Sequence, residues 1–242
     1  MKDSDEFYIG YLPKAPPGLA RFSRRAVAAA AGAALAGGIA LAVALPYFGA
    51  GEFEFGTTRE FRGTLRCAVA PRLAAAEADF LLVGAGKRGA PLEICGAGEG
   101  EVALRGTLIR RDGRQLLEVT DVPQALRAAG PEAEPVALGR FTLTGEIVDS
   151  KCFFGVMNPA EGRAHRACAV QCLRGGVPAV FVARDRTGAT SHLLITGPHG
   201  EAINAALLAW VGEIVEGSGE VERRGRWLVW RIDPALLRRA GS

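Results

Sequence analysis

The sequence predicts a mainly β protein that follows one N-terminal apolar helix, and three observations support this fold class. Residues 26–51 contain no charged side chain. From residue 59 onward, short apolar runs and alternating apolar and polar residues are typical of strands. Several of these runs are paired across glycine-containing turns, which is the pattern of β-hairpins. We therefore expect a single membrane-spanning helix and then a β-rich body.

The apolar segment has the length and the flanking charges of a membrane anchor. About twenty helical residues at 1.5 Å each cross the roughly 30 Å hydrocarbon core of a bilayer. Three arginines precede the segment and two glutamates follow it: Arg21, Arg24, Arg25, Glu52 and Glu54. Because positive charge favours the cytoplasmic side, residues 1–25 are expected in the cytoplasm and residues 26–48 in the membrane. In a bacterial inner (cytoplasmic) membrane, the rest of the chain would be periplasmic or otherwise extracytoplasmic.

Two other interpretations of the N-terminus remain open. Residues 42–44 could form the cleavage site of a secretory signal, although such signals have a shorter apolar region. The Arg24-Arg25 pair could belong to a twin-arginine export signal, although the residues after it fit that signal poorly. The favoured interpretation is an uncleaved anchor.

The body shows the same plan twice. Strands are expected at residues 61–67, 79–83, 90–94, 102–109, 115–119, 141–148, 180–183, 192–196, 213–221 and 227–232. In the second half, a helix at residues 201–211 separates two hairpins. A strand, a hairpin, a helix and a hairpin in this order are expected of a small five-stranded OB-type barrel. The sequence thus predicts one or two OB-like units, with a single mixed β domain as the alternative.

The expected domain boundaries follow from this repeat. The first β-rich, OB-like unit is placed at residues 57–128, and a proline-containing linker at residues 129–137. The second OB-like unit, with a cysteine- and histidine-bearing helix inserted, is placed at residues 138–236. The Gly-Ala-Gly-Lys-Arg-Gly run at residues 84–89 resembles a dinucleotide fingerprint. No helix pattern opens at its last glycine, so a turn is the expected structure.

The most informative segment is a cysteine–histidine cluster in the second half. A short helix is expected at residues 161–174, and His165, Cys168 and Cys172 would share one of its faces. Cys152 ends the preceding strand, and Met157 lies in the connecting loop. Three thiols, an imidazole and a nearby thioether are ligands of soft metals. A site for zinc or copper is therefore one interpretation of these residues, with Met157 as an additional candidate ligand.

Disulfide bonds are the competing interpretation of the same residues. The chain contains five cysteines: Cys67, Cys95, Cys152, Cys168 and Cys172. Outside the cytoplasm the compartment is oxidising, so Cys67 could pair with Cys95, and Cys152 with Cys168 or Cys172. One thiol would then remain free, because five is an odd number. Exchanging thiols beside His165 are a third alternative. Asp149 and Lys151 could orient His165 or tune a thiolate, but surface positions are the simpler expectation.

Composition narrows the function classes. The net charge of +3 is spread along the chain, so nucleic acid is not an expected partner. The sequence shows no serine–histidine–aspartate arrangement or phosphate-binding loop, so a non-enzymatic role is favoured. Two roles remain: an accessory or assembly subunit of a membrane complex, which binds a soft metal or is stapled by disulfides, and a thiol-redox or metal-handling protein.

The motif around the cluster also resembles a known family. Bacterial membrane-anchored proteins without an assigned activity share a Gly-Glu-Ile-Val-Asp-x-Lys-Cys segment, then His-x-x-Cys-Ala-x-x-Cys and Gly-Gly-x-Pro. The matching positions here are residues 145–152, 165–172 and 175–178. The likeness covers about a quarter of the predicted soluble body. It implies a membrane anchor in general plan, and it implies no activity.

Overall fold

The computed structural model describes residues 15–44, 51–96, 98–121, 127–185 and 187–241. The chain divides into two compact units, Met1–Gly49 and Ala50–Ser242. The first unit contains helix α1, Pro17–Ala44, which is long and apolar enough to cross a membrane. It begins earlier than the expected residue 26, because a proline suits the first helical turn and the following leucine, alanines and arginines favour helix. Residues 45–48, the end of the predicted span, lie outside the described residues.

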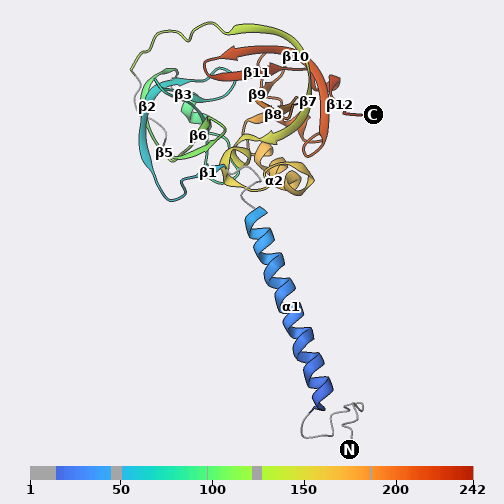
Figure 1. The fold of residues 1–242 in the computed structure, drawn as a ribbon. Coiled ribbons are helices and arrows are strands. Elements are labelled where there is room, and N and C mark those ends of the chain that lie inside the picture. The colour runs from blue at the N-terminus through green and yellow to red at the C-terminus, as the bar shows by residue number, and fades with distance from the viewer. Residues whose placement is uncertain (1–14, 45–50, 97, 122–126, 186, 242) are drawn as a thin grey trace, which may run out of the picture. The chain divides into compact units, whose positions relative to one another are not determined.

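The second unit is mainly β and contains two closed five-stranded barrels (Figure 1). The first barrel consists of β2 (Arg59–Arg66), β3 (Arg72–Ala74), β4 (Asp79–Val83), β5 (Gly100–Arg111) and β6 (Arg114–Val119). Its strands follow the order β5-β2-β3-β4-β6, and β6 pairs with β5 to close the barrel. The β4–β6 pair is parallel and the other pairs are antiparallel. This is an OB-like arrangement, as predicted.

The second barrel repeats this pairing. It consists of β7 (Val136–Asp149), β8 (Ala179–Arg184), β9 (Thr190–Thr196), β10 (Ile214–Arg224) and β11 (Trp227–Arg231). The order is β11-β9-β8-β7-β10, β10 pairs with β11, and β9–β11 is the parallel pair. Short outer strands extend the sheets, with β1 (Glu52–Phe53) on β5 and β12 (Arg238–Arg239) on β10. The two barrels therefore have equivalent strand orders, as the repeat in the sequence suggested.

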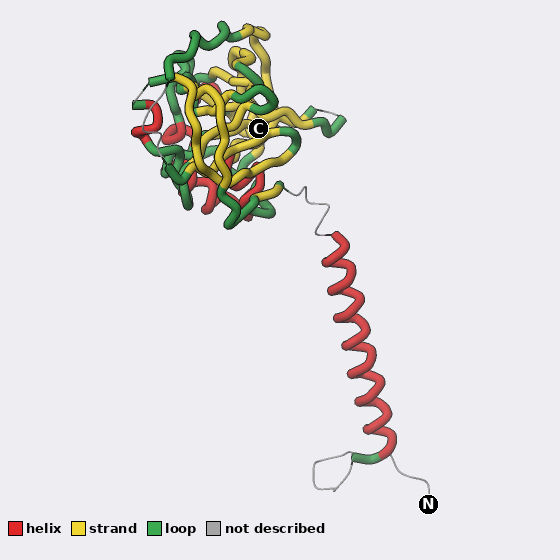
Figure 2. The backbone as a smooth tube through the Cα atoms, turned by 90° about the vertical axis from the view of Figure 1, so that its left-hand side faces the viewer, coloured by secondary structure: helices red, strands yellow, loops and turns green. Residues whose placement is uncertain are grey.

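The helices occupy defined places between the strands. Helix α2 (Gly162–Arg174) follows the π-helical turn η3 (Cys152–Val156), and both lie between β7 and β8. Helix α3 (Asn204–Leu207) lies between β9 and β10, and the 3-10 turn η2 (Leu92–Cys95) occupies the same position in the first barrel. A further 3-10 turn, η4 (Pro234–Leu236), precedes β12. Figure 2 shows the strands in yellow and the helices in red.

Two sequence-based expectations about these connections were wrong. Residues 90–94, expected as a strand, form a bend at Ala90 and the start of η2, in which Leu92 is 92% exposed. A half-buried strand would have covered that side chain. The helix expected over residues 201–211 is confined to α3, and turns follow it until Gly212, whose φ is +74°. A left-handed glycine ends the helical stretch there.

The two barrels share a hydrophobic core. One cluster of buried side chains joins Leu81 and Ile109 of the first barrel to Val180 and Trp227 of the second. The Trp227 indole donates a hydrogen bond to the Asp79 carbonyl oxygen at 2.9 Å, which links β11 to β4. The barrels therefore pack as parts of one body, with a candidate site at the side where η3 and α2 meet the first barrel.

Candidate metal centre

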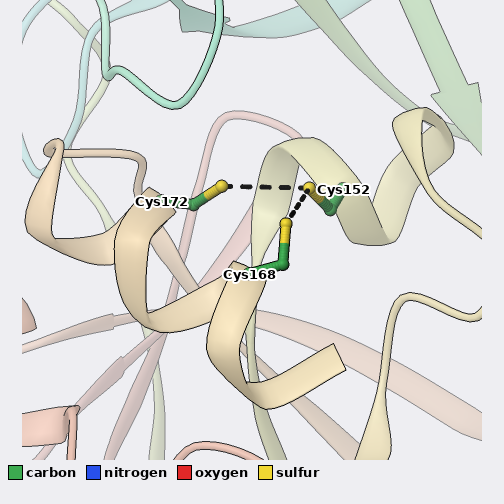
Figure 3. A group of neighbouring side chains, drawn as sticks. All are labelled: Cys152, Cys168 and Cys172. Atoms are coloured by element: carbon green, nitrogen blue, oxygen red, sulfur yellow. Dashed lines mark hydrogen bonds between the residues drawn. The ribbon is translucent and has the colours of Figure 1, made fainter. Parts of the chain in front are cut away.

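The three cysteines of the second barrel converge from two elements (Figure 3). Cys152 opens η3, shortly after β7 ends at Asp149. Cys168 and Cys172 lie one helical turn apart on α2, so their side chains share a face. Helix α2 spans nearly the range that the sequence predicted, and it ends at Gly175 and Gly176 as the glycine pair indicated.

The sulfur atoms lie close together without a covalent bond. The Cys152 Sγ is 3.9 Å from the Cys168 Sγ and 3.8 Å from the Cys172 Sγ. All three sulfurs lie within 4.8 Å of one another. Cys152 and Cys172 are buried, whereas Cys168 is partly exposed. The cluster therefore has a closed side and a side that solvent reaches at Cys168.

Asp149 contacts both Cys152 and His165 beside the cluster. It is completely buried, and its Oδ1 accepts a hydrogen bond from the Cys152 backbone N–H at 2.9 Å. Its Oδ2 lies 3.0 Å from the His165 Nε2. The ligand atoms of Asp149, Cys152 and His165 also lie within 4.8 Å of one another. Thus His165 stands next to the cluster, and one of its ring nitrogens already engages Asp149.

The thiols of Cys152 and Cys172 titrate as a pair. The hydrogen bond to the Cys172 sulfur raises the pKa of the Cys152 thiol, and burial raises it further. The same bond lowers the pKa of the Cys172 thiol, and the nearby charge of Lys87 acts in the same direction. Cys172 is therefore the member of this pair that ionises more readily.

The first barrel contributes a loop to the cluster, which the sequence analysis did not predict. Residues 84–89 form a turn, as expected, but the Lys87 Nζ lies 3.2 Å from the Cys168 Sγ. That contact raises the pKa of the Lys87 amine, so the amine is held as a cation. Sequence spacing offered no sign of this, because Lys87 and Cys168 belong to different barrels. A lysine between glycines in a turn was the only available signal.

Two neighbouring charges are buried, contrary to the expected surface positions. Asp149 lies beneath Cys152, and Lys151 is only 2% exposed. The Lys151 Nζ donates hydrogen bonds to the Gly84 and Gly86 carbonyl oxygens at 2.6 and 2.7 Å, and it forms an ion pair with Glu118. A buried charge requires such compensation. Lys151 therefore fastens η3 to the first barrel.

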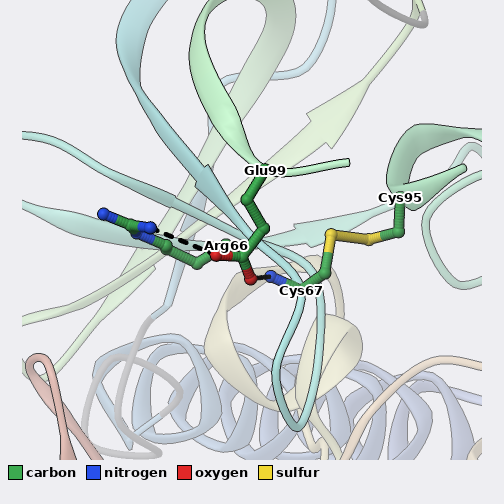
Figure 4. The surroundings of a disulfide bond; sticks show 4 residues. All are labelled: Arg66, Cys67, Cys95 and Glu99. Carbon is green, nitrogen blue, oxygen red and sulfur yellow. Dashed lines mark hydrogen bonds and ion pairs between the residues drawn. A yellow bond between two sulfur atoms is a disulfide. The ribbon is translucent and has the colours of Figure 1, made fainter. Parts of the chain in front are cut away.

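Cys67, Cys95 and Met157 do not belong to this cluster. Cys67 and Cys95 form a disulfide within the first barrel, where a Glu99 carboxylate accepts the Cys67 N–H at 2.8 Å (Figure 4). Met157 follows η3 on the loop, and its side chain is 45% exposed. Cys152, Cys168 and Cys172 are free thiols. Three thiols in this arrangement can hold a soft cation, or two of them can form a disulfide.

Comparisons with known proteins add no relative to this description. No protein-family model matches the chain. No curated protein matches it, and no solved structure does.

Proposed function

We propose that this protein is a membrane-anchored module that binds a soft metal ion through Cys152, Cys168 and Cys172. The spacing of the sulfurs supports this most directly. Metal–thiolate bonds of about 2.3 Å, arranged tetrahedrally, hold sulfurs about 3.8 Å apart. The separations from the Cys152 Sγ are 3.8 and 3.9 Å. The Cys152 sulfur therefore lies at the spacing of metal ligands from both of the other sulfurs.

The surroundings of the sulfurs also suit a bound cation. Two of the three thiols are buried, and an isolated buried thiolate is costly in free energy. A metal ion offsets that cost, because it deprotonates the thiols it binds and pairs with their charge. Asp149 fixes the Cys152 backbone through a hydrogen bond of 2.9 Å. Hydrogen bonds that orient ligands in this way are typical of metal centres.

Zinc and monovalent copper are the ions that thiolates select. Three sulfurs leave the fourth zinc position to water or to a donor from outside, whereas monovalent copper accepts three thiolates. His165 is adjacent, but its Nε2 lies 3.0 Å from the Asp149 carboxylate. We assign His165 the role of orienting Asp149 and, through it, Cys152. Met157 is left outside the ligand set because its side chain is 45% exposed.

The proposed location is a bacterial inner membrane, with residues 1–25 on the cytoplasmic side and the barrels outside. Helix α1 is long and apolar enough to span a bilayer, and the arginines at its N-terminal end favour that orientation. The Cys67–Cys95 disulfide is in keeping with an oxidising compartment. An anchored metal module of this kind would serve as an accessory or assembly subunit of a membrane complex.

Thiol exchange is the second candidate function, and the partly exposed Cys168 favours it. Its sulfur lies 3.9 Å from the Cys152 Sγ and beside the Lys87 cation. A disulfide between Cys152 and Cys168 would form with loss of two protons and two electrons to an external disulfide, which becomes a dithiol. A positive neighbour and solvent access favour such reactivity.

Metal content and thiol counts separate the two functions. The full-length protein, purified in detergent under anaerobic conditions, is expected to carry one zinc or copper ion per chain. Cys168→Ser and Cys172→Ser should each lose the ion, because two thiolates hold it too weakly. Met157→Leu serves as the control and should retain it. A protein without metal, but with a disulfide in the cluster after mild oxidation, would support exchange instead. Co-purification of a second membrane protein tests the accessory role.

A further inference from the structure

The loop at residues 84–89 is fastened to the second barrel on both of its sides. The Gly89 N–H donates a hydrogen bond to the Gly175 carbonyl oxygen at 2.9 Å. A Cβ atom at Gly175 would lie 1.8 Å from the Lys87 carbonyl oxygen, and one at Gly89 would lie 2.3 Å from the Gly176 oxygen. Only glycines allow these backbones to approach so closely. The loop is therefore held in place directly over the end of α2.

The loop is also held by the segment that carries Cys152. Lys151 precedes that cysteine, and its amine reaches the Gly84 and Gly86 carbonyl oxygens at 2.6 and 2.7 Å. Within the loop, the Gly84 N–H donates to the Arg88 carbonyl oxygen at 3.0 Å. The backbone around Lys87 is consequently fixed from three directions. Its amine, at 3.2 Å from the Cys168 Sγ, lies at the side of the cluster that solvent reaches.

Charge counting gives this lysine a role. Three thiolates with a divalent ion carry a net charge of −1, and with a monovalent ion they carry −2. A cation beside Cys168 offsets one unit of either charge. We propose that Lys87 is the counter-ion of the loaded site, so that the first barrel supplies a necessary part of a centre whose ligands all belong to the second barrel. This inference rests on the proposed metal binding.

The counter-ion role predicts a particular pattern of affinities. Lys87→Met should weaken zinc binding about tenfold. This loss is at the low end of what residues next to metal ligands usually contribute, because the Lys87 side chain is exposed. It should weaken monovalent copper binding more, because that complex carries one more negative charge. Lys87→Arg should retain affinity within about threefold, since the charge is kept. Arg88→Met, on the same loop, is the matched control and should match the wild type.

The experiment is a competition titration of the full-length protein in detergent, with chromophoric chelators for zinc and for monovalent copper. The thermal midpoint of each metal-free variant is recorded as well. The proposal is supported if Lys87→Met loses affinity, loses more for copper than for zinc, and keeps the wild-type midpoint. Equal affinities of Lys87→Met and wild type would overturn it, and so would an equal loss for both ions. A wild-type protein that binds neither ion would instead refute the proposed function itself.

Discussion

At the scale of single residues, His192 shows how burial sets a protonation state. Its ring lies 5.4 Å from that of Phe153 and 5.3 Å from that of Phe154, measured between centroids. Burial lowers the pKa of His192 to about 4, against a weaker opposing effect of the Asp112 carboxylate. The imidazole is therefore neutral in the folded protein at neutral pH. It supports the aromatic side chains that directly follow Cys152 in η3.

This lowered pKa predicts a pH dependence of stability. Between about pH 6.5 and pH 4 the unfolded chain binds a proton at His192 that the folded chain does not. The free energy of unfolding should therefore fall as the pH falls through this window, by on the order of 2 kcal/mol. This value is smaller than the full pKa shift would give, because the site keeps some solvent contact. His192→Gln should flatten this part of the profile. Denaturant titrations from pH 7.5 to 4 measure it, and an unchanged slope in the variant would contradict the assignment.

The sequence identified the three clustered cysteines but not their surroundings. Cys152, Cys168 and Cys172 could be grouped because a helix places positions four apart on one face, and the strand before it ends near Cys152. Asp149 was expected at the surface because a charged side chain usually is, yet it is fully buried. Its two partners come from η3 and α2. Such compensation depends on tertiary contacts that periodicity does not reveal.

At the scale of elements, the end of α2 determines how closely the two barrels approach. Gly175 has a φ of −76°, so its backbone would accept any residue. The reason for a glycine is space, because an added Cβ atom would lie 1.8 Å from the Lys87 carbonyl oxygen. The sequence indicated a helix stop at this point, and it gave no sign that the stop is also a packing contact.

A substitution at this glycine should consequently act through packing alone. Gly175→Ala is expected to lower the free energy of unfolding by about 2 kcal/mol, since a backbone shift is needed to relieve the overlap. Gly130→Ala is the matched control, because nothing lies within 4 Å of its Cβ position. Chemical denaturation of both variants gives the comparison. Equal stabilities would mean that the loop yields freely and that the contact is not tight.

The elements themselves were largely predictable, and the exceptions have physical reasons. The strand runs and the hairpin turns agreed with β5–β6, β8–β9 and β10–β11, because alternation and turn glycines are local signals. The start of α1 at Pro17 was missed because the expected start, residue 26, was set by the beginning of the uncharged run. Residues 90–94 were wrongly expected as a strand, because a short apolar run alone does not distinguish a strand from a helical turn.

At the scale of the whole molecule, the barrels are joined by a core and by buried charges. Arg72 is 1% exposed and its guanidinium lies 2.6 Å from the Asp79 carboxylate. Glu132, between the barrels in sequence, pairs with Arg72 and with Arg224. An ion pair removed from water is costly when one partner is lost. The segment between the barrels therefore clamps them together rather than acting as a free linker.

This arrangement predicts that Ala50–Ser242 unfolds as one cooperative unit. Trp230 packs in the core of the second barrel, where its ring centroid lies 4.5 Å from that of Phe181. Trp230→Ala should remove about 3–5 kcal/mol, and the loss should appear equally in the first barrel. Hydrogen exchange of the β4 amides is the readout, with Trp227→Ala as the companion variant at the shared core. A first barrel that keeps its wild-type protection in Trp230→Ala would show that the barrels are independent.

The position of the Cys67–Cys95 disulfide in the first barrel has a consequence for biogenesis. A ribosome delivers the chain from the N-terminus, so Cys67 and Cys95 emerge before any thiol of the cluster. In an oxidising compartment these two can pair while no competing cysteine is present. The three later thiols then meet a barrel whose own cysteines are already consumed. In such a compartment, the order of residues along the chain thereby keeps Cys67 and Cys95 from mispairing with the cysteines of the cluster.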